Sequence, residues 1–333
     1  MGHAPALDAA SMDRFLQDVA PGSGARVTGF RPISGGYSRL SAMADVQWGD
    51  GATAAFVLRA DPPPDTGVFQ SDRDAEFRLL QSLQGNLAVG TPNVRWYDST
   101  GEYFGAKCLV VDFFASTPLF ELAQRDLAAA TDLFVDTIAA VHAAPLDVVP
   151  DALDRPADWN QYVDGVIGHL RSIDSSLTSA HPALHYAAAQ LAAHKPPPAP
   201  LTLVHGDCQP ANVLVPATGA VLVIDWEFGR IGDPREDLGY YSHLPVPPNL
   251  YEADPDRFLE RYRERSGLSE EQVNPATVAY FYVLGVARLI GQMITAADVV
   301  ARGGSRGVMA TYLLNGISAT TERFVEIARR IAS

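Results

Sequence analysis

The sequence predicts an α+β fold of two lobes: a five-stranded antiparallel sheet with one helix, followed by a mainly helical lobe. Short runs rich in β-branched and aromatic residues fill the chain before residue 113, whereas apolar residues recur at helical spacing from Thr117 onward. At 333 residues, 47% of them hydrophobic, the chain has the length and apolar content of two packed domains. We therefore expect lobes at residues 1–112 and 113–333.

The charge balance disfavours polyanionic partners. The chain carries 25 basic and 39 acidic residues, for a formal charge of −14, which opposes nonspecific attraction to nucleic acid or to an anionic membrane. We expect neither partner. The acidity could attract a cationic substrate, but solubility alone accounts for it.

Two features favour a cytoplasmic protein. The chain has 2 cysteines, Cys108 and Cys208, which allow neither a disulfide framework nor zinc-ligand spacing. Its start, Met1 to Ala10, has neither the basic segment nor the apolar run of a secretory signal. A cytoplasmic location is therefore expected.

The N-terminal part is predicted to be a helix followed by an antiparallel meander. The helix would run from Asp8, its cap, to Ala20 before Pro21-Gly22. The segment Gly49-Asp50-Gly51 is a hairpin signal. The expected strands are Ala25–Ile33, Leu40–Trp48, Ala52–Arg59, Val94–Tyr97 and Lys107–Phe113.

The loop between the first two strands has the composition of a phosphate-binding loop. Paired glycines, Gly35 and Gly36, allow close backbone approach to a ligand, and the hydroxyls of Ser34 and Ser38 could donate to phosphate oxygens. The alternative is an ordinary hairpin turn, in which paired glycines are common.

Arg59 and Glu76 are predicted to pair. Glu76 lies in a predicted helix, Ser71–Gln84, and shares a face with Leu79, Leu80 and Leu83. A buried carboxylate needs a cation, which Arg59 at the end of the third strand could supply. The alternative is a glutamate at the edge of the apolar stripe that reaches solvent.

The C-terminal part is predicted to be helical. Asp126–Ala143 carries Leu127, Phe134, Ile138 and Val141 on one face, with His142 as a core or capping residue. The segment Ala276–Ala297 is apolar but contains Arg288 and Gln292, which favours a core helix over a membrane span. The other expected helices are 159–172, 182–194, 255–266, 270–301 and 305–331.

Three oxygen-bearing side chains are expected to converge where two short apolar runs, predicted to be strands, come to an end. Asp207 and Asn212 lie in a loop after one short apolar run, and Asp225 ends the next, Val221–Ile224. A hairpin would bring them together. Asn212 and Asp225 suit magnesium, which takes few carboxylates plus substrate phosphates, and Asp207 would accept a proton from a hydroxyl. Alternatively, these residues only cap turns.

The motifs H-G-D-x-x-x-x-N, from His205 to Asn212, and I-D-W-E around Asp225 resemble those of the aminoglycoside phosphotransferase family, a protein-kinase-like group. Gly206 stands where many protein kinases carry arginine, and Trp226-Glu227 replaces Phe-Gly. The resemblance implies a kinase-like fold, an ATP or GTP cofactor, magnesium, and phosphorylation of a small-molecule hydroxyl.

The resemblance also implies roles for other residues. Arg59 stands where the family carries a phosphate-binding lysine, and the G-G-x-S form of the loop at 34–38 is similar to the family's phosphate loop. His205 would pack structurally. The adenine-contacting hinge would fall on Val111, Asp112 and Phe113, and the acids bracing the catalytic loop would be Asp233 and Asp237.

The acceptor is left open by the sequence. An aminoglycoside would require a cluster of carboxylates, whereas the segment Leu58–Pro63 is similar to kinase-like domains fused to acyl-CoA dehydrogenases, which suggests a hydroxylated acid or thioester. Because arginine replaces the usual lysine at Arg59, a nucleotide-binding scaffold without catalysis is the alternative function.

Overall fold

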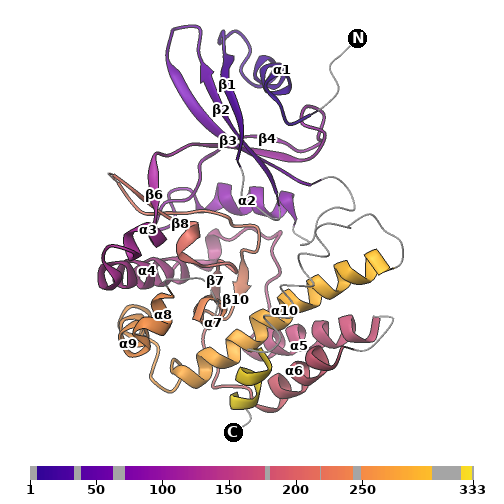
Figure 1. Ribbon diagram of the computed structural model, residues 1–333, viewed down its shortest axis with the longest axis vertical. Coiled ribbons are helices and arrows are strands. Elements are labelled where there is room, and N and C mark those ends of the chain that lie inside the picture. The colour runs from indigo at the N-terminus through magenta and orange to yellow at the C-terminus, as the bar shows by residue number, and fades with distance from the viewer. Residues whose placement is uncertain are drawn as a thin grey trace.

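The protein has two lobes, one above the other in Figure 1, and a cavity lined by residues of both lobes forms the cleft between them. The computed structural model describes residues 6–33, 39–62, 72–176, 181–217, 219–242, 249–301 and 324–331. The strands of the N-terminal lobe stand above helix α2, and the helices of the C-terminal lobe lie below it (Figure 1). The predicted α+β class is confirmed.

The N-terminal lobe is built on one antiparallel sheet of 5 strands in the order β1-β2-β3-β5-β4. The predicted meander and its two additional strands are therefore present, with no bound shifted by more than one residue. The strands are β1 (Arg26–Ile33), β2 (Leu40–Gln47), β3 (Thr53–Ala60), β4 (Val94–Asp98) and β5 (Cys108–Asp112).

A helix covers each face of this sheet. On one face, α1 (Ala9–Val19) packs against the buried side chains of alternate residues of β2 and β3. Asp8 caps this helix, and its Oδ1 accepts from Ser11 N at 2.8 Å. On the other face, α2 (Arg73–Leu83) buries Leu79, Leu80 and Leu83 against β5. The prediction had only one helix on the sheet, so the position of α1 against it is a correction. The prediction also started α2 at Ser71, whereas the helix begins at Arg73 and its cap is Asp72.

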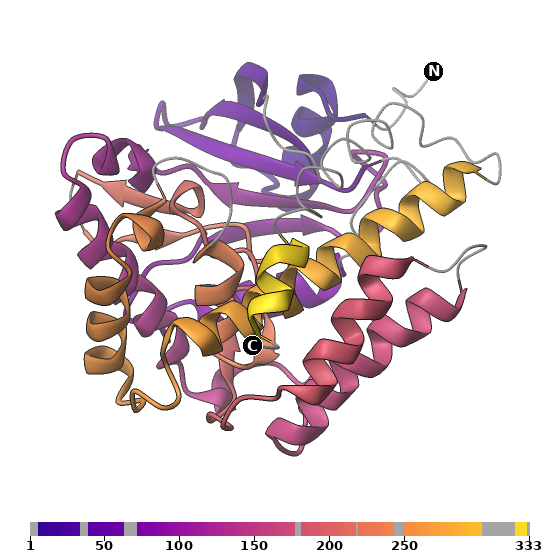
Figure 2. The same ribbon diagram turned by 60° about the horizontal axis from the view of Figure 1, so that its bottom comes forward.

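The C-terminal lobe consists mainly of helices, in which α10 runs across α5 and α6 while α4, α8 and α9 form a group beside them (Figure 2). Two apolar clusters fill it, one between α10 and the pair α5 and α6, the other between α4 and α9. These helices are α3 (Leu119–Ala123), α4 (Leu127–His142), α5 (Trp159–Ser176), α6 (Pro182–Ala193), α7 (Arg235–Ser242), α8 (Leu250–Ala253), α9 (Pro255–Ser266) and α10 (Pro275–Ala301).

Two predictions for this lobe need correction, and a third is tested only in part. Leu127, placed on the apolar face of α4, is 40% exposed because it is the first helical residue. Helix α10 begins at Pro275 rather than 270, after a turn in which Asn274 accepts from Ala276 N and Thr277 N. Of the predicted helix at 305–331, the part before 324 lies outside the described residues; 324–331 is helical.

Helix α10 has the length and composition of a membrane span over Pro275–Asp298, among the residues that the structure describes. Its apolar window is 61% buried inside the protein, against α5, α6 and residues 324–328. The helix therefore packs as a core helix, as its interrupted apolar pattern predicts.

Short strands position the loops at the cleft. β7 (Thr202–Val204) pairs with β10 (Arg230–Gly232), while β8 (Val213–Pro216) pairs with β9 (Leu222–Val223) and β6 (Ser116–Pro118). The chain therefore turns between β7 and β8, and again between β9 and β10, at the same edge. These are the two loops that carry Asp207 and Asp225.

Candidate active site

The loop from His205 to Asn212, here called the catalytic-type loop, is held in place by His205. His205 donates from Nε2 to the carbonyl oxygen of Ile224 at 2.8 Å, and its ring packs against Trp226 with centroids 4.8 Å apart. These contacts join the loop after β7 to the strand that delivers Asp225. They support the structural role expected for His205.

Gly206 is required by the close approach of β10. Its φ is +83°, in the left-handed region that favours glycine, and an added Cβ would lie 2.4 Å from an amino nitrogen of Arg230 and 2.6 Å from the carbonyl oxygen of Phe228. An arginine here would meet both obstacles. The glycine in the H-G-D motif thus has a local steric cause.

Asp207 is held by two amides. Gln209 Nε2 donates to its Oδ1 at 3.0 Å and Asn212 Nδ2 to its Oδ2 at 2.9 Å. Burial raises the pKa of Asp207 and the charge of Asp225 adds to this, although His205 and hydrogen bonds from Tyr240 and Asn212 oppose it. A positioned carboxylate with a raised pKa suits proton transfer.

Asn212 and Asp225 come together across a hairpin. Ile224 N donates to the carbonyl oxygen of Asn212 at 2.9 Å, which brings Asp225 beside the loop. Asp225 has φ +69°, and it is the only non-glycine residue with positive φ in the described chain. Such strain outside glycine occurs most often at functional sites.

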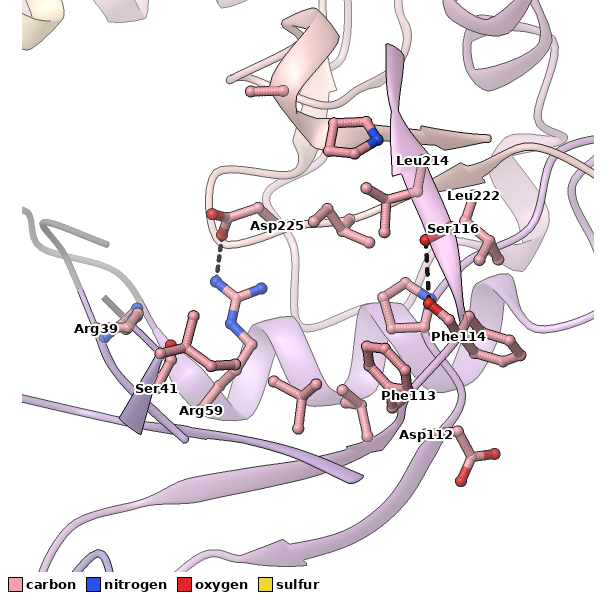
Figure 3. Close-up of a pocket in the computed structure, with 17 residues that line it drawn as sticks. Arg39, Ser41, Arg59, Asp112, Phe113, Phe114, Ser116, Leu214, Leu222 and Asp225 are labelled. Atoms are coloured by element: carbon pink, nitrogen blue, oxygen red, sulfur yellow. Dashed lines mark hydrogen bonds and ion pairs between the residues drawn. The ribbon is translucent and has the colours of Figure 1, made fainter. Parts of the chain in front are cut away.

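Arg59 faces Asp225 across the cleft (Figure 3). Its amino nitrogen donates to Asp225 Oδ1, with the arginine side chain 14% exposed and the aspartate 27% exposed. Burial disfavours the charge of Asp225, but the ion pair with Arg59 outweighs it and lowers the pKa of this carboxyl. The two lobes therefore contribute opposite charges to one site.

The predicted pairing of Arg59 with Glu76 is only marginal. Their closest charged atoms are 4.0 Å apart, while Arg73 approaches Glu76 to 2.7 Å. Arg73 is buried and lies one turn before Glu76 on α2, so it is the main partner of the Glu76 carboxylate. Arg73 also contacts Asp61 at 3.0 Å, a role that the sequence pattern did not predict.

Arg39 is a second cation at the site that was not predicted from the sequence. It lies just before β2, contacts Asp61 at 2.7 Å and reaches across the cleft to Glu227 at 2.9 Å. Glu227 belongs to the I-D-W-E segment, two residues after Asp225. Glu227, a second acidic residue so close to Asp225, was the available signal that a further cation must approach this motif.

A cavity of about 590 Å³ lies between the lobes and ends at Arg59 and Asp225 (Figure 3). Its apolar walls include Val111 and Phe113 on one lobe and Leu222 on the other. This size and lining fit a flat aromatic ligand with a charged end. The predicted phosphate-loop residues Ser34, Gly35, Gly36 and Ser38 lie outside the described residues.

Within the predicted hinge, the Asp112 side chain points away from the cavity (Figure 3). It accepts from Asn93 at 2.6 Å and from Arg95 at 2.9 Å. Hinge contacts to a ligand would therefore come from the backbone here, and from the side chains of Val111 and Phe113.

The two acids after the I-D-W-E segment brace different parts. Asp237 accepts from the backbone N–H groups of His205 and Gly206, both at 2.8 Å, and its Oδ2 lies 3.0 Å from His142 Nε2. Asp233 accepts from Trp159 Nε1 at 2.6 Å and pairs with Arg235 at 2.7 Å. Asp237 thus contacts the catalytic-type loop directly, and Asp233 anchors the start of α7.

The donor set suits a hard divalent cation. In the described chain no three His, Cys, Asp or Glu side chains are grouped to hold a metal. Asn212 uses Nδ2 for both of its contacts with Asp207, so the amide oxygen takes no part in them. One amide oxygen and the Asp225 carboxylate are the sparse oxygen ligands that magnesium uses alongside phosphates.

The fold and this site together define a two-lobed, kinase-like phosphotransferase architecture. Residues 29–278 match the model of the phosphotransferase enzyme family (APH), and the chain belongs to that family.

Solved structures share this fold along nearly the whole chain. A putative aminoglycoside phosphotransferase from Ralstonia eutropha is 17% identical with a TM-score of 0.68, covering 97% of this chain and 98% of that one. A thermostable variant of aminoglycoside phosphotransferase APH(4)-Ia, in a ternary complex with ADP and hygromycin B, is 16% identical with a TM-score of 0.63, covering 96% and 98%.

One curated relative matches part of the chain. Acyl-CoA dehydrogenase family member 10 of Mus musculus is 25% identical over 199 residues, which are 57% of this chain and 18% of that protein. The chain therefore spans a small part of that relative's length.

Proposed function

We propose that the protein transfers the terminal phosphoryl group of ATP or GTP to a hydroxyl group of a small molecule. The observation that carries this proposal is the convergence of Asp207, Asn212 and Asp225 at the end of an interlobe cavity, opposite Arg59. Bound ADP in the related APH(4)-Ia complex supports a nucleotide in this cavity.

Asp207 is the proton acceptor in this proposal. Held by Gln209 and Asn212, it orients the acceptor hydroxyl and takes its proton as the oxygen bonds to the terminal phosphorus. The bond from that phosphorus to its bridging oxygen breaks, and the nucleoside diphosphate leaves. Because the pKa of Asp207 is raised, its carboxylate is a better base than an ordinary aspartate.

The phosphates are positioned from both lobes. Arg59 supplies positive charge from β3, and the 34–38 loop is proposed to donate from its backbone and hydroxyls. Asn212 and Asp225 would hold magnesium, which when bound neutralises charge on the phosphates. The hinge side chains Val111 and Phe113 would flank the adenine or guanine ring of the nucleotide.

Two measurements on the full chain test this proposal. Thermal-shift titration with ATP or GTP, with and without magnesium, should raise the melting temperature. A panel of small hydroxyl compounds should then give acceptor-dependent release of nucleoside diphosphate. Nucleotide binding without turnover across acids, thioesters and aminoglycosides would favour the alternative, a nucleotide-binding scaffold; no nucleotide binding would contradict both.

A further inference from the structure

We infer that the acceptor carries a carboxylate group, which is bound by Arg288 and Arg230 beside Asp207. This inference rests on the proposed function, since it concerns the acceptor side of the same site. It is carried by a second set of cavities, distinct from the nucleotide-sized one, that opens next to the catalytic-type loop.

These cavities adjoin Asp207. The smaller, about 90 Å³, is lined by Gly206, which precedes Asp207, and by Tyr240, which hydrogen-bonds to it. The neighbouring cavity, about 320 Å³, shares four lining residues with it. The shared residues are Phe228, Arg230, Arg288 and Gln292. A small molecule bound here would place a hydroxyl near Asp207 while its other end contacts the arginines.

Among the described residues, the two arginines share a single carboxylate. Arg230 contacts Glu236 Oε2 at 2.5 Å and Arg288 contacts the same oxygen at 2.6 Å, while Tyr162 donates to Oε1. Burial opposes the charge of Glu236, but Arg288 and Arg230 outweigh it and lower its pKa. This cluster thus carries one surplus positive charge, which matches one carboxylate.

The arginines are fixed but remain accessible. Arg288 also donates to Tyr162 Oη at 3.1 Å, and Arg230 to the carbonyl oxygen of Phe228 at 2.9 Å. Their side chains are still 23% and 27% exposed. A guanidinium held in place by a buried acid loses little freedom when it binds a carboxylate, so such a pair is pre-organised for anion recognition.

Among the residues that the structure describes, the acidic side chains lining these cavities are already engaged, which disfavours a polycationic acceptor. In the larger cavity, Glu76 pairs with Arg73, Glu227 pairs with Arg39, and Asp72 caps α2. In the smaller one, Glu236 is the only carboxylate among the described lining residues, and it is neutralised. An acceptor with several ammonium groups would meet guanidinium groups instead of free acids.

The test uses short-chain hydroxy acids that differ in hydroxyl position, each paired with its neutral primary amide. With ATP and magnesium, we expect the wild-type protein to prefer an acid over its amide by about tenfold or more in kcat/KM, the size of a lost charge-assisted contact. Calorimetric titration of the same pairs without nucleotide measures binding separately from turnover.

Three variants test whether the preference for the acid over the amide depends on Arg288. Arg288→Gln should raise KM for the acid about 10-fold to 100-fold and leave KM for the amide and for ATP little changed. Arg288→Lys, which keeps the charge but not the planar fork, should lie between. Arg257→Gln, which removes an arginine of α9 that pairs with Asp132 of α4, should match the wild type.

Each outcome decides the point. Equal binding and turnover of acids and amides, or an Arg288→Gln loss that is the same for both, would overturn the inference, as would failure of every acid to bind. Acid binding that requires Arg288, without any phosphoryl transfer, would uphold the anion site and contradict the proposed function. Near-ultraviolet circular dichroism and the ATP thermal shift confirm that each variant is folded.

Discussion

Arg59 and Asp225 form an ion pair across the interlobe cleft although they are 166 residues apart in the chain. The arginine is the last residue but one of β3 in one lobe, and the aspartate has a positive φ just after a strand of the other lobe. The contact defines the charged end of the nucleotide-sized cavity (Figure 3).

Arg59→Lys should retain nucleotide binding, with KM for ATP changed by less than about tenfold, because the contact with Asp225 needs one positive charge and not a planar fork. Arg59→Ala should raise KM for ATP further and lower kcat. Steady-state kinetics at varied ATP measures both. Equal effects of the two substitutions would show that charge at this position is not what matters.

Asp207→Asn should lower kcat by about 10²-fold to 10⁴-fold, the usual contribution of a general base. The variant keeps the size of the side chain and one acceptor oxygen, so the ATP-induced thermal shift should persist. Kinetics and thermal shift on the same preparation separate chemistry from binding. Unchanged kcat would remove Asp207 from its assigned role.

The rate should depend on the ionisation of Asp207. Only the carboxylate form accepts a proton, and burial raises its pKa. An ordinary aspartate has a pKa of about 3.9. Because the pKa of Asp207 is raised, kcat/KM should begin to fall at a higher pH than it would with an ordinary aspartate as the base. A pH profile with saturating ATP measures this. A profile that stays flat down to the ordinary aspartate range would contradict it.

Asp237→Asn should destabilise the protein by about 3 kcal/mol, since it removes a buried charge that holds two loop N–H groups and His142. Burial opposes the charge of Asp237, but the hydrogen bond from His142 leads the contacts that lower its pKa. Its contribution is therefore full above about pH 5 and is lost as pH falls through the lowered folded-state pKa.

Urea unfolding at a series of pH values checks this prediction. The wild type should lose stability on acidification more steeply than Asp237→Asn. Glu260→Gln, at an exposed position of α9, should change stability by no more than about 0.5 kcal/mol. Parallel curves for the wild type and Asp237→Asn would show that Asp237 has no such linkage.

Gly206→Ala should cost about 1–3 kcal/mol of stability and lower activity, because positive φ and the approach of Arg230 and Phe228 both oppose a Cβ. Gly165→Ala is the matched control: in helix α5, with nothing within 4 Å of an added Cβ, it should stabilise by up to about 1 kcal/mol. Thermal unfolding and kinetics measure the difference, and equal behaviour of both variants would contradict the steric argument.

Local patterns were enough to predict most elements. Asp8 and Asp126 cap helices that begin at the following residue, and the strand runs of the N-terminal sheet pair in the expected antiparallel manner. These features depend on backbone chemistry and apolar periodicity within a few residues. Element ends were less predictable where a turn competes with the helix, as before Pro275.

Partner choice among charged residues could not be predicted from the sequence. Glu76 was expected to pair with Arg59, but Arg73 on the same helix lies closer. Arg230 and Arg288 come from a short strand and a long helix, and their shared contact with Glu236 has no sequence signature. Such pairs form between elements that meet only after packing.

The sequence by itself determined the order of elements and the motif residues His205, Asp207, Asn212 and Asp225, because their spacing is short and their strands are local. Only the tertiary structure decided which cation faces each acid: Arg59 opposite Asp225, Arg73 on Glu76, and two arginines on Glu236. The reason is physical. Coulombic contacts between side chains are set by distances of a few ångströms in space, and packing of the lobes fixes those distances.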